Sequence, residues 1–293
     1  MLKQRVLTAL AMLAVIVGAY FISPIAFAGV MGVAFMLAMY EWLKLSGLNL
    51  TGVRITSAVV GLITLLGMWY FFLLVNSPNA TQSDSMGVAM LCFAYVAFVA
   101  VFWLGLAVRV FMARHTGMKM HPAMVCFTAL AFAPAAWISF LIIYAGFGLP
   151  MVLSVLFIVW IADVMAYFAG RAFGKRRLAP ALSPKKSWEG VAGGMLSVIA
   201  AGFLCHYFVP YSTLPQVSIH AMGPLGWVIV AVVLTALSII GDLFESAIKR
   251  QAGVKDSGTL LPGHGGFYDR LDAMMPTLPV ALVLLALLTF PGL

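Results

Sequence analysis

Long uninterrupted runs of apolar side chains leave this 293-residue chain few choices of fold. A helix needs about 20 mostly apolar residues to cross a bilayer, and nine such runs follow one another along the sequence. A β-barrel would instead show short segments of alternating polarity. Only 9% of the residues are charged, against about 25% in soluble domains. The sequence therefore predicts an all-α, polytopic integral membrane protein and excludes a soluble enzyme, a disordered protein and a collagen-like chain.

The predicted spans are separated by short polar connections. They cover residues 6–23, 25–43, 55–75, 87–108, 122–145, 150–170, 190–209, 225–247 and 274–291. Pro134 lies in the middle of the fifth span and predicts a kink, because proline removes one hydrogen bond of the helix. All three cysteines lie inside apolar runs, and no two have the spacing of metal ligands. Neither a disulfide framework nor a zinc site is indicated.

All 17 lysines and arginines fall on one side of the membrane if nine spans alternate. They precede the first span or lie in the even-numbered loops between spans. In the odd-numbered loops, Asp84 is the only charged residue. By the positive-inside rule, the N-terminus is cytoplasmic and the C-terminus lies on the far side. Cations that flank membrane spans also account for the net charge of +8, so the charge does not indicate nucleic-acid binding.

The N-terminus has one alternative interpretation. Lys3 and Arg5, the apolar run and then Ala26-Phe27-Ala28 resemble a cleavable signal peptide. We favour a retained span, because the run is long for a signal peptide and a second span follows at once. Cleavage would leave the later topology unchanged.

Acidic residues are concentrated in the second half of the chain. The first 150 residues hold only Glu41 and Asp84, while seven acids follow. Asp163 and Asp242 lie inside apolar spans, where a charged carboxylate costs about 2.5–3.5 kcal/mol and normally faces a polar interior. We therefore divide the chain into membrane helices at 1–148, with spans one to five, and a catalytic membrane region at 149–293, with spans six to nine and cytoplasmic loops 171–189 and 248–273.

Two pairs of acids flank the last cytoplasmic loop. Asp242 and Glu245 are three residues apart inside a predicted helix, which places them on one helix face. Asp269 and Asp272 have the same spacing just before the last span. Carboxylates alone would repel one another, whereas carboxylates interleaved with Lys and Arg suit a divalent cation that bridges to phosphate. Oxygen ligands favour Mg²⁺, with Mn²⁺ as the other candidate.

Glycines in the same loop suit an anion. Gly265 and Gly266 would let backbone N–H groups approach a phosphate closely. His264 could donate to a phosphate or orient a carboxylate, and an ordinary loop histidine fits equally well.

The loop before span seven is also basic. Lys185 and Lys186 could bind polyphosphate or anionic lipid headgroups, although the positive-inside bias already accounts for part of this charge. Glu189 and the hydroxyl groups of Ser183 and Ser187 lie beside these lysines and favour a binding role.

A long motif begins at Ser246. It reads Ser246-Ala-Ile-Lys249-Arg250, four residues, Lys255-Asp256, then Gly258, Leu261-Pro262 and His264-Gly-Gly-Phe-Tyr-Asp269-Arg270-Leu-Asp272. This pattern resembles the complete signature of the phosphatidate cytidylyltransferases, the CDP-diacylglycerol synthases. The segments from Asp163 to Lys175 and from Ser183 to Gly190 also resemble family segments, so the similarity extends over about 163 to 272.

The resemblance implies that CMP passes from CTP to phosphatidate with Mg²⁺, at the cytoplasmic face of a bacterial inner membrane. We expect Asp242 and Asp269 to hold the metal, with Glu245 and Asp272 as nearby ligands or orienting groups. The sequence does not decide whether a second metal ion binds or whether the protein forms a homo-oligomer. The groups expected to contact phosphates are Lys185, Lys186, Lys249, Arg250, Lys255 and Arg270, while Asp163 would line the polar cavity.

Two other functions would use similar residues. A CTP-dependent polyprenol kinase, which resembles this family in its helical plan, would release CDP instead of pyrophosphate. An ion-coupled transporter would explain intramembrane acids, but its acids should lie near the midplane, whereas most acids here cluster with bases in and beside one cytoplasmic loop. The Asp-x-x-Asp-Gly-x-x-Ala-Arg pattern of CDP-alcohol phosphotransferases is absent.

Overall fold

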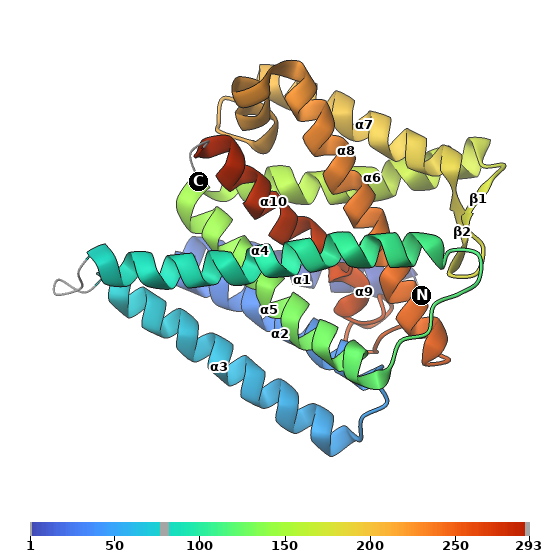
Figure 1. Ribbon diagram of the computed structural model, residues 1–293, viewed down its shortest axis with the longest axis horizontal. Coiled ribbons are helices and arrows are strands. Elements are labelled where there is room, and N and C mark those ends of the chain that lie inside the picture. Colours follow the sequence, from blue (N-terminus) through green and yellow to red (C-terminus); the bar gives the residue numbers. More distant parts are fainter. Residues whose placement is uncertain (1, 77–81, 291–293) are drawn as a thin grey trace. The chain divides into compact units, whose positions relative to one another are not determined.

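The computed structural model describes residues 2–76 and 82–290, which are mostly helical (Figure 1). Its helices follow the predicted spans, because a backbone in lipid has to satisfy its hydrogen bonds within its own segment. The elements are α1 (Leu2–Ile22), α2 (Pro24–Lys44), α3 (Leu50–Asn76), α4 (Gln82–Met112), α5 (Pro122–Phe147), α6 (Leu149–Phe173), β1 (Arg177–Ala179), β2 (Ser183–Ser187), α7 (Trp188–Phe208), α8 (Leu214–Gln251), α9 (Tyr268–Leu271) and α10 (Met274–Thr289).

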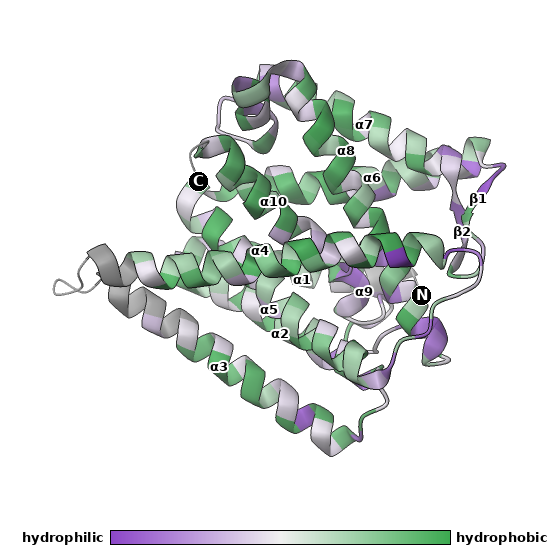
Figure 2. Cartoon of the chain, viewed as in Figure 1, coloured by the Kyte–Doolittle hydropathy of each residue, from purple (hydrophilic) through white to green (hydrophobic). Residues whose placement is uncertain are grey.

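Within the described residues, eight helices are long and apolar enough to cross a membrane. The apolar part of α1, Val6–Ile22, is shorter. Figure 2 shows hydrophobic residues along most of the helices, with hydrophilic residues at β1–β2 and at the C-terminal end of α8. The all-α, multi-pass prediction is therefore confirmed, whereas the count of nine and the side of each terminus stay predictions. The predicted end of the last span at 291 lies outside the described residues.

Two segments differ from the prediction. The loop expected at 171–189 contains an antiparallel hairpin in which β1 pairs with β2. Helix α8 begins well before the predicted 225 and bends at Gly223, whose φ of 71° suits glycine and whose neighbour Pro224 lacks a backbone N–H. It also continues through Gln251, so part of the loop predicted at 248–273 is helical.

The chain forms two compact units, each made from separate stretches of sequence. Unit one comprises Met1–Val99, Met120–Ile138 and Ala252–Leu271, and unit two comprises Ala100–Lys119, Ser139–Gln251 and Asp272–Leu293. The division that we predicted at residue 148 separates the N-terminal membrane helices from the catalytic region by function, whereas these units are defined by packing. The functional division stays a prediction.

Helices α6 and α7 of unit two pack closely because glycines line their contact. A Cβ atom on Gly194 would lie 2.7 Å from the Ala162 carbonyl oxygen, and one on Gly190 would lie 2.8 Å from that of Ala166. Small residues permit this approach, as they do in membrane helices generally. The contact places the hairpin, which leads directly into α7, beside the end of α6.

In unit one, α2 carries a buried aromatic cluster. Trp42 is fully buried, stacks on Tyr268 with ring centroids 4.4 Å apart and meets Phe132 edge to face at 5.9 Å. Aromatic pairs of this geometry add to the stability that burial itself provides. The stacking fixes α9 against the end of α2.

Candidate active site

Three acids converge in unit two. Asp242 and Glu245 share a face of α8, and Asp272 stands just before α10. Each offers one carboxylate oxygen, and these oxygens all lie within 4.8 Å of one another. Gly241 permits this approach, because a Cβ there would lie only 2.5 Å from the backbone oxygen of Asp272. We call Asp242, Glu245 and Asp272 the acidic triad.

Two lysines offset the repulsion within the triad. Lys186 Nζ lies 2.6 Å from Asp242 Oδ2, and Lys249 Nζ lies 2.8 Å from Glu245 Oε2. The Ser246 hydroxyl donates to Asp242 Oδ1 at 3.3 Å. Burial lowers the pKa of Lys186, but attraction to Asp242 outweighs this effect and leaves the pKa above its ordinary value. Lys186 therefore carries its positive charge at neutral pH.

The acidic triad fits a hard divalent cation. Its donors are all oxygen atoms, which Mg²⁺ prefers, and the three oxygens lie close enough together that they could hold one ion. Asp242, Glu245 and Asp272 are thus the residues of unit two that could hold the predicted metal.

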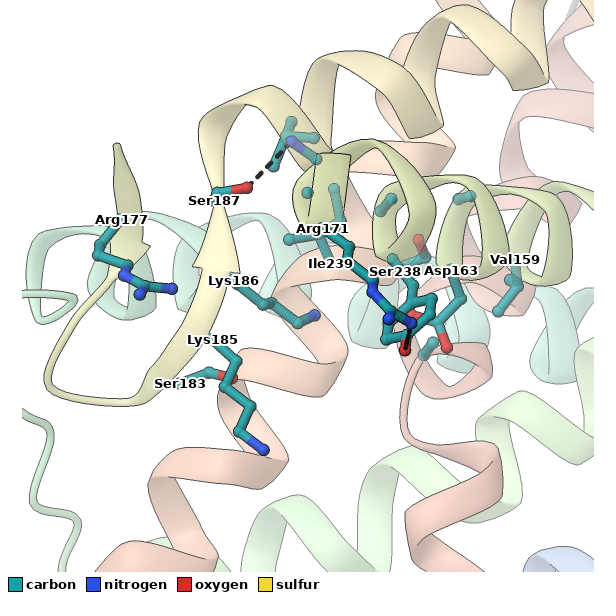
Figure 3. A pocket seen from close by; sticks show the side chains of 17 residues that line it. Val159, Asp163, Arg171, Arg177, Ser183, Lys185, Lys186, Ser187, Ser238 and Ile239 are labelled. Atoms are coloured by element: carbon teal, nitrogen blue, oxygen red, sulfur yellow. Dashed lines mark hydrogen bonds between the residues drawn. The ribbon is translucent and has the colours of Figure 1, made fainter. Parts of the chain in front are cut away.

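A pocket of about 490 Å³ lies beside the triad in unit two and is shared among α6, the hairpin, α7 and α8. Lys186 belongs both to its lining and to the ion pair with Asp242. Figure 3 labels cationic lining residues together with the apolar side chains of Val159 and Ile239. The sequence-predicted residues that line it are Asp163, Ser183, Lys185, Lys186 and Ser187. Arg171 and Arg177, from the basic cluster that precedes Ser183 in the sequence, line it as well.

Two of the predicted binding residues, Ser187 and Glu189, form hydrogen bonds that stabilise the start of α7 and the turn after α6. The Ser187 hydroxyl caps α7 by accepting the Gly190 N–H at 3.2 Å, as serine commonly does at a helix start. The Glu189 carboxylate accepts the backbone N–H groups of Lys175 at 3.1 Å and Arg176 at 3.2 Å. These contacts fasten the turn after α6 to α7, and a direct role of Ser187 and Glu189 in binding stays a prediction.

Asp269 lies in unit one and is held by the segment that we call the signature loop, residues 252–267. Its Oδ2 atom accepts the Gly266 N–H at 2.8 Å, the Ser257 N–H at 2.9 Å and the Ser257 hydroxyl at 3.0 Å. Gly265 has φ +85° and lies so close that a Cβ would be 2.7 Å from Asp269 Oδ2. Gly265 and Gly266, which we predicted for phosphate approach, therefore enclose a carboxylate in this structure.

Basic residues of the signature loop and of α9 line a second hollow. Arg270 donates to the His264 carbonyl oxygen through Nε at 3.1 Å and a terminal nitrogen at 2.5 Å. The hollow has a volume of about 480 Å³, and its lining includes Lys255, His264, Gly265 and Arg270. Arg250, also predicted to contact phosphate, is exposed at the end of α8.

One buried acid of unit one was missed by the sequence analysis. Glu41 on α2 is only 1% exposed, and its Oε2 atom accepts the Tyr268 N–H at 3.0 Å and the Ser257 hydroxyl at 3.2 Å. The signal was available, because an acid inside a predicted span is the feature that singled out Asp163 and Asp242. We had set Glu41 aside because the other acids cluster in the second half.

Comparison with known proteins decides the family. A sequence profile described as the cytidylyltransferase family matches residues 3–288. The chain belongs to this family. The chain is 35% identical to a phosphatidate cytidylyltransferase of Haemophilus influenzae over 95% of this chain and 96% of the relative.

Two further relatives carry the same name. The phosphatidate cytidylyltransferase of Pseudomonas aeruginosa is 32% identical over 97% of both chains. That of Thermotoga maritima is 41% identical over 149 residues, which are 51% of this chain and 54% of the relative. The resemblance inferred from the signature is therefore confirmed.

Proposed function

We propose that this cytidylyltransferase transfers CMP from CTP to phosphatidate, producing CDP-diacylglycerol and pyrophosphate for phospholipid synthesis. Relatives with that printed name match almost the whole chain. The structural observation that carries the proposal is the acidic triad with Lys186 and Lys249 paired to it. Acids and bases interleaved in this way suit a reaction between two polyanions.

The chemistry needs positioning more than a strong base. Phosphatidate presents a phosphate oxygen that is already anionic and can attack the α-phosphorus of CTP. A new phosphorus–oxygen bond forms there, and the bond to the bridging oxygen breaks as pyrophosphate leaves with its electrons. The barrier lies in bringing the anions together and stabilising the charge of the leaving group.

The residues of unit two divide this work. The acidic triad would hold Mg²⁺, and a bound Mg²⁺ would neutralise charge on the triphosphate. Lys186 pairs with Asp242 and also lines the pocket, so its ammonium group can pass from the carboxylate to an incoming phosphate. Lys185 and Arg171 supply further positive charge in the pocket.

The same pocket suits a lipid headgroup. Its cations lie beside apolar lining residues such as Val159 and Ile239, a combination that matches a phosphate joined to acyl chains. We place this site at the cytoplasmic face of a bacterial inner membrane, because the relatives are bacterial and the predicted topology puts every lysine and arginine on that side.

A direct assay tests the proposed function. The purified full-length protein in detergent is incubated with CTP, phosphatidate and Mg²⁺, and both pyrophosphate and the lipid product are measured. We expect CDP-diacylglycerol and pyrophosphate in equal amounts. If an established synthase is active under the same conditions and this protein makes no CDP-diacylglycerol, the proposal is wrong. Release of CDP with a polyprenol substrate would support the kinase alternative instead.

A matched pair of variants connects the reaction to the triad. Asp242→Asn keeps the size of the side chain but removes its charge. We expect turnover to fall by about 100-fold or more, because even groups that only orient metal ligands contribute about 10- to 100-fold. Asp84→Asn makes the same chemical change at the acid predicted for the opposite side of the membrane, and should leave turnover unchanged. Equal activity of the two variants would remove Asp242 from the reaction.

A further inference from the structure

A carboxylate from the first third of the chain is built into the signature loop. Glu41 lies on α2, 216 residues before Ser257, yet its Oε2 atom accepts the Ser257 hydroxyl at 3.2 Å. The same oxygen accepts the backbone N–H of Tyr268, the first residue of α9, at 3.0 Å. A carboxylate that is 1% exposed is costly to bury unless it accepts hydrogen bonds, and here Oε2 receives these two.

The loop is shaped to receive this side chain. A Cβ atom on Gly258 or on Gly266 would collide with the Glu41 carboxylate. The two glycines therefore let the backbone wrap around Glu41 from both sides. Trp42, the residue after Glu41 on α2, stacks on the Tyr268 ring. The end of α2 therefore contacts both the signature loop and α9.

Ser257 connects Glu41 to Asp269. Its hydroxyl oxygen lies 3.2 Å from Glu41 Oε2 and 3.0 Å from Asp269 Oδ2, and its backbone N–H donates to Asp269 Oδ2 at 2.9 Å. A single hydroxyl proton lies between two carboxylates, so both acids hold the same serine in place. Moving Glu41 would move Ser257, and with it two of the donors that fix Asp269.

We infer that Glu41 is a positioning residue of the cytidylyl transfer: it holds Ser257 and the start of α9, and through them it sets the place of the Asp269 carboxylate. The inference rests on the proposed function, because Asp269 is expected to hold metal in that reaction. The Glu41 carboxylate bonds to the Ser257 hydroxyl and the Tyr268 N–H. Its contribution is to the geometry of the loop, beyond the general stability of α2.

Two substitutions at Glu41 and one control separate these roles. Glu41→Ala removes the acceptor, whereas Glu41→Gln keeps the shape and offers an amide oxygen to the Tyr268 N–H and the Ser257 hydroxyl. Ser46→Ala is the control, because Ser46 is buried at the end of the same helix and its hydroxyl donates to the Leu43 carbonyl at 2.6 Å. It weakens the end of α2 without removing a hydrogen bond to the loop.

The first readout is amide hydrogen exchange in the full-length protein in detergent, without CTP or Mg²⁺. We expect peptides that cover Ser257 and Tyr268 to exchange on the order of tenfold faster in Glu41→Ala than in wild type. Glu41→Gln and Ser46→Ala should exchange there at nearly the wild-type rate. Unchanged exchange in Glu41→Ala would overturn the inference, whatever the activity of the protein proves to be.

The second readout is the Mg²⁺ concentration that gives half-maximal CDP-diacylglycerol synthesis. Groups that orient metal ligands typically affect metal affinity or activity by about 10- to 100-fold, so we expect a rise of that size in Glu41→Ala and substantial recovery in Glu41→Gln. A loss of maximal rate with the same Mg²⁺ requirement, or equal loss in Ser46→Ala, would assign Glu41 to stability alone. If the wild-type protein makes no CDP-diacylglycerol, the proposed function is wrong. The hydrogen-exchange result still tests whether Glu41 holds the signature loop, because it does not depend on activity.

Discussion

The ion pair between Lys186 and Asp242 predicts that removing a cation will tighten metal binding. Lys186 Nζ lies 2.6 Å from Asp242 Oδ2, with 23% and 29% of the two side chains exposed. The ammonium group therefore contacts the carboxylate that is proposed to bind the metal ion. Lys186→Met keeps the length of the side chain and removes the competing charge.

The size of the effect follows from the distance and the exposure. At an effective dielectric constant of about 20, opposite charges 2.6 Å apart attract by about 6 kcal/mol. Desolvation and screening cancel most of this attraction when a pair is partly exposed, and a net value of about 1–2 kcal/mol is reasonable. Release of that energy corresponds to Mg²⁺ binding that is about 5- to 30-fold tighter in the variant.

The assay measures thermal unfolding of the nucleotide-free protein during Mg²⁺ titration after chelator treatment. We expect the half-saturating Mg²⁺ concentration to fall in Lys186→Met, while synthesis at saturating Mg²⁺ declines because a phosphate-binding cation is gone. Lys185→Met is the control, since it removes the same charge from the same strand and Lys185 forms no salt bridge within the described residues. Unchanged or weaker Mg²⁺ binding in Lys186→Met would refute the reasoning.

Three further substitutions probe the site and its support. Gly241→Ala should lower both synthesis and the unfolding temperature, because the new methyl group would lie 2.5 Å from the Asp272 backbone oxygen; wild-type behaviour in both measurements would contradict this packing. Asp272→Asn should abolish the Mg²⁺-dependent rise in unfolding temperature, and a persistent rise would remove Asp272 from the metal site. Trp42→Ala should lower the free energy of unfolding by about 3–5 kcal/mol in denaturant titration, since Trp42 is fully buried against Tyr268.

The membrane helices could be predicted from sequence because lipid leaves the backbone almost no alternative. The span predicted at 25–43 is the helix Pro24–Lys44, and that at 150–170 is the helix Leu149–Phe173. The ends were less accurate, since a helix can continue past its apolar run into polar residues. Lys249 and Arg250, which we assigned to a loop, form the last turn of α8, where cations suit the helix dipole.

The hairpin was not predictable from hydrophobic pattern. Strands β1 and β2 have only three and five residues, and Ser183-Pro-Lys-Lys-Ser187 shows no alternation of apolar and polar side chains that would mark a strand. The hairpin depends on its place between α6 and α7, including the contact of Glu189 with the backbone of Lys175 and Arg176. Such contacts cannot be read from local sequence.

The site was only partly accessible to sequence reasoning. Spacing on one helix predicted that Asp242 and Glu245 share a face, and the structure brings Asp272, which was also predicted for the metal site, close to both. The expected metal-binding role of Asp269 stays a prediction, while its hydrogen bonds show how the loop holds it. The role of Glu41 was not predicted, because its hydrogen-bond partners are more than 200 residues away in the sequence. Residue spacing within one helix cannot predict contacts over such a separation.

That separation has a consequence for how the enzyme is made. A ribosome adds roughly 5–20 residues per second, so the 216 residues between Glu41 and Ser257 take on the order of 10–40 s to synthesise. For all of that time the nascent chain holds a glutamate whose partners have not yet been translated. Chains that stall before the signature loop therefore lack Ser257 and Tyr268, the two residues whose donors the Glu41 carboxylate accepts in the folded protein.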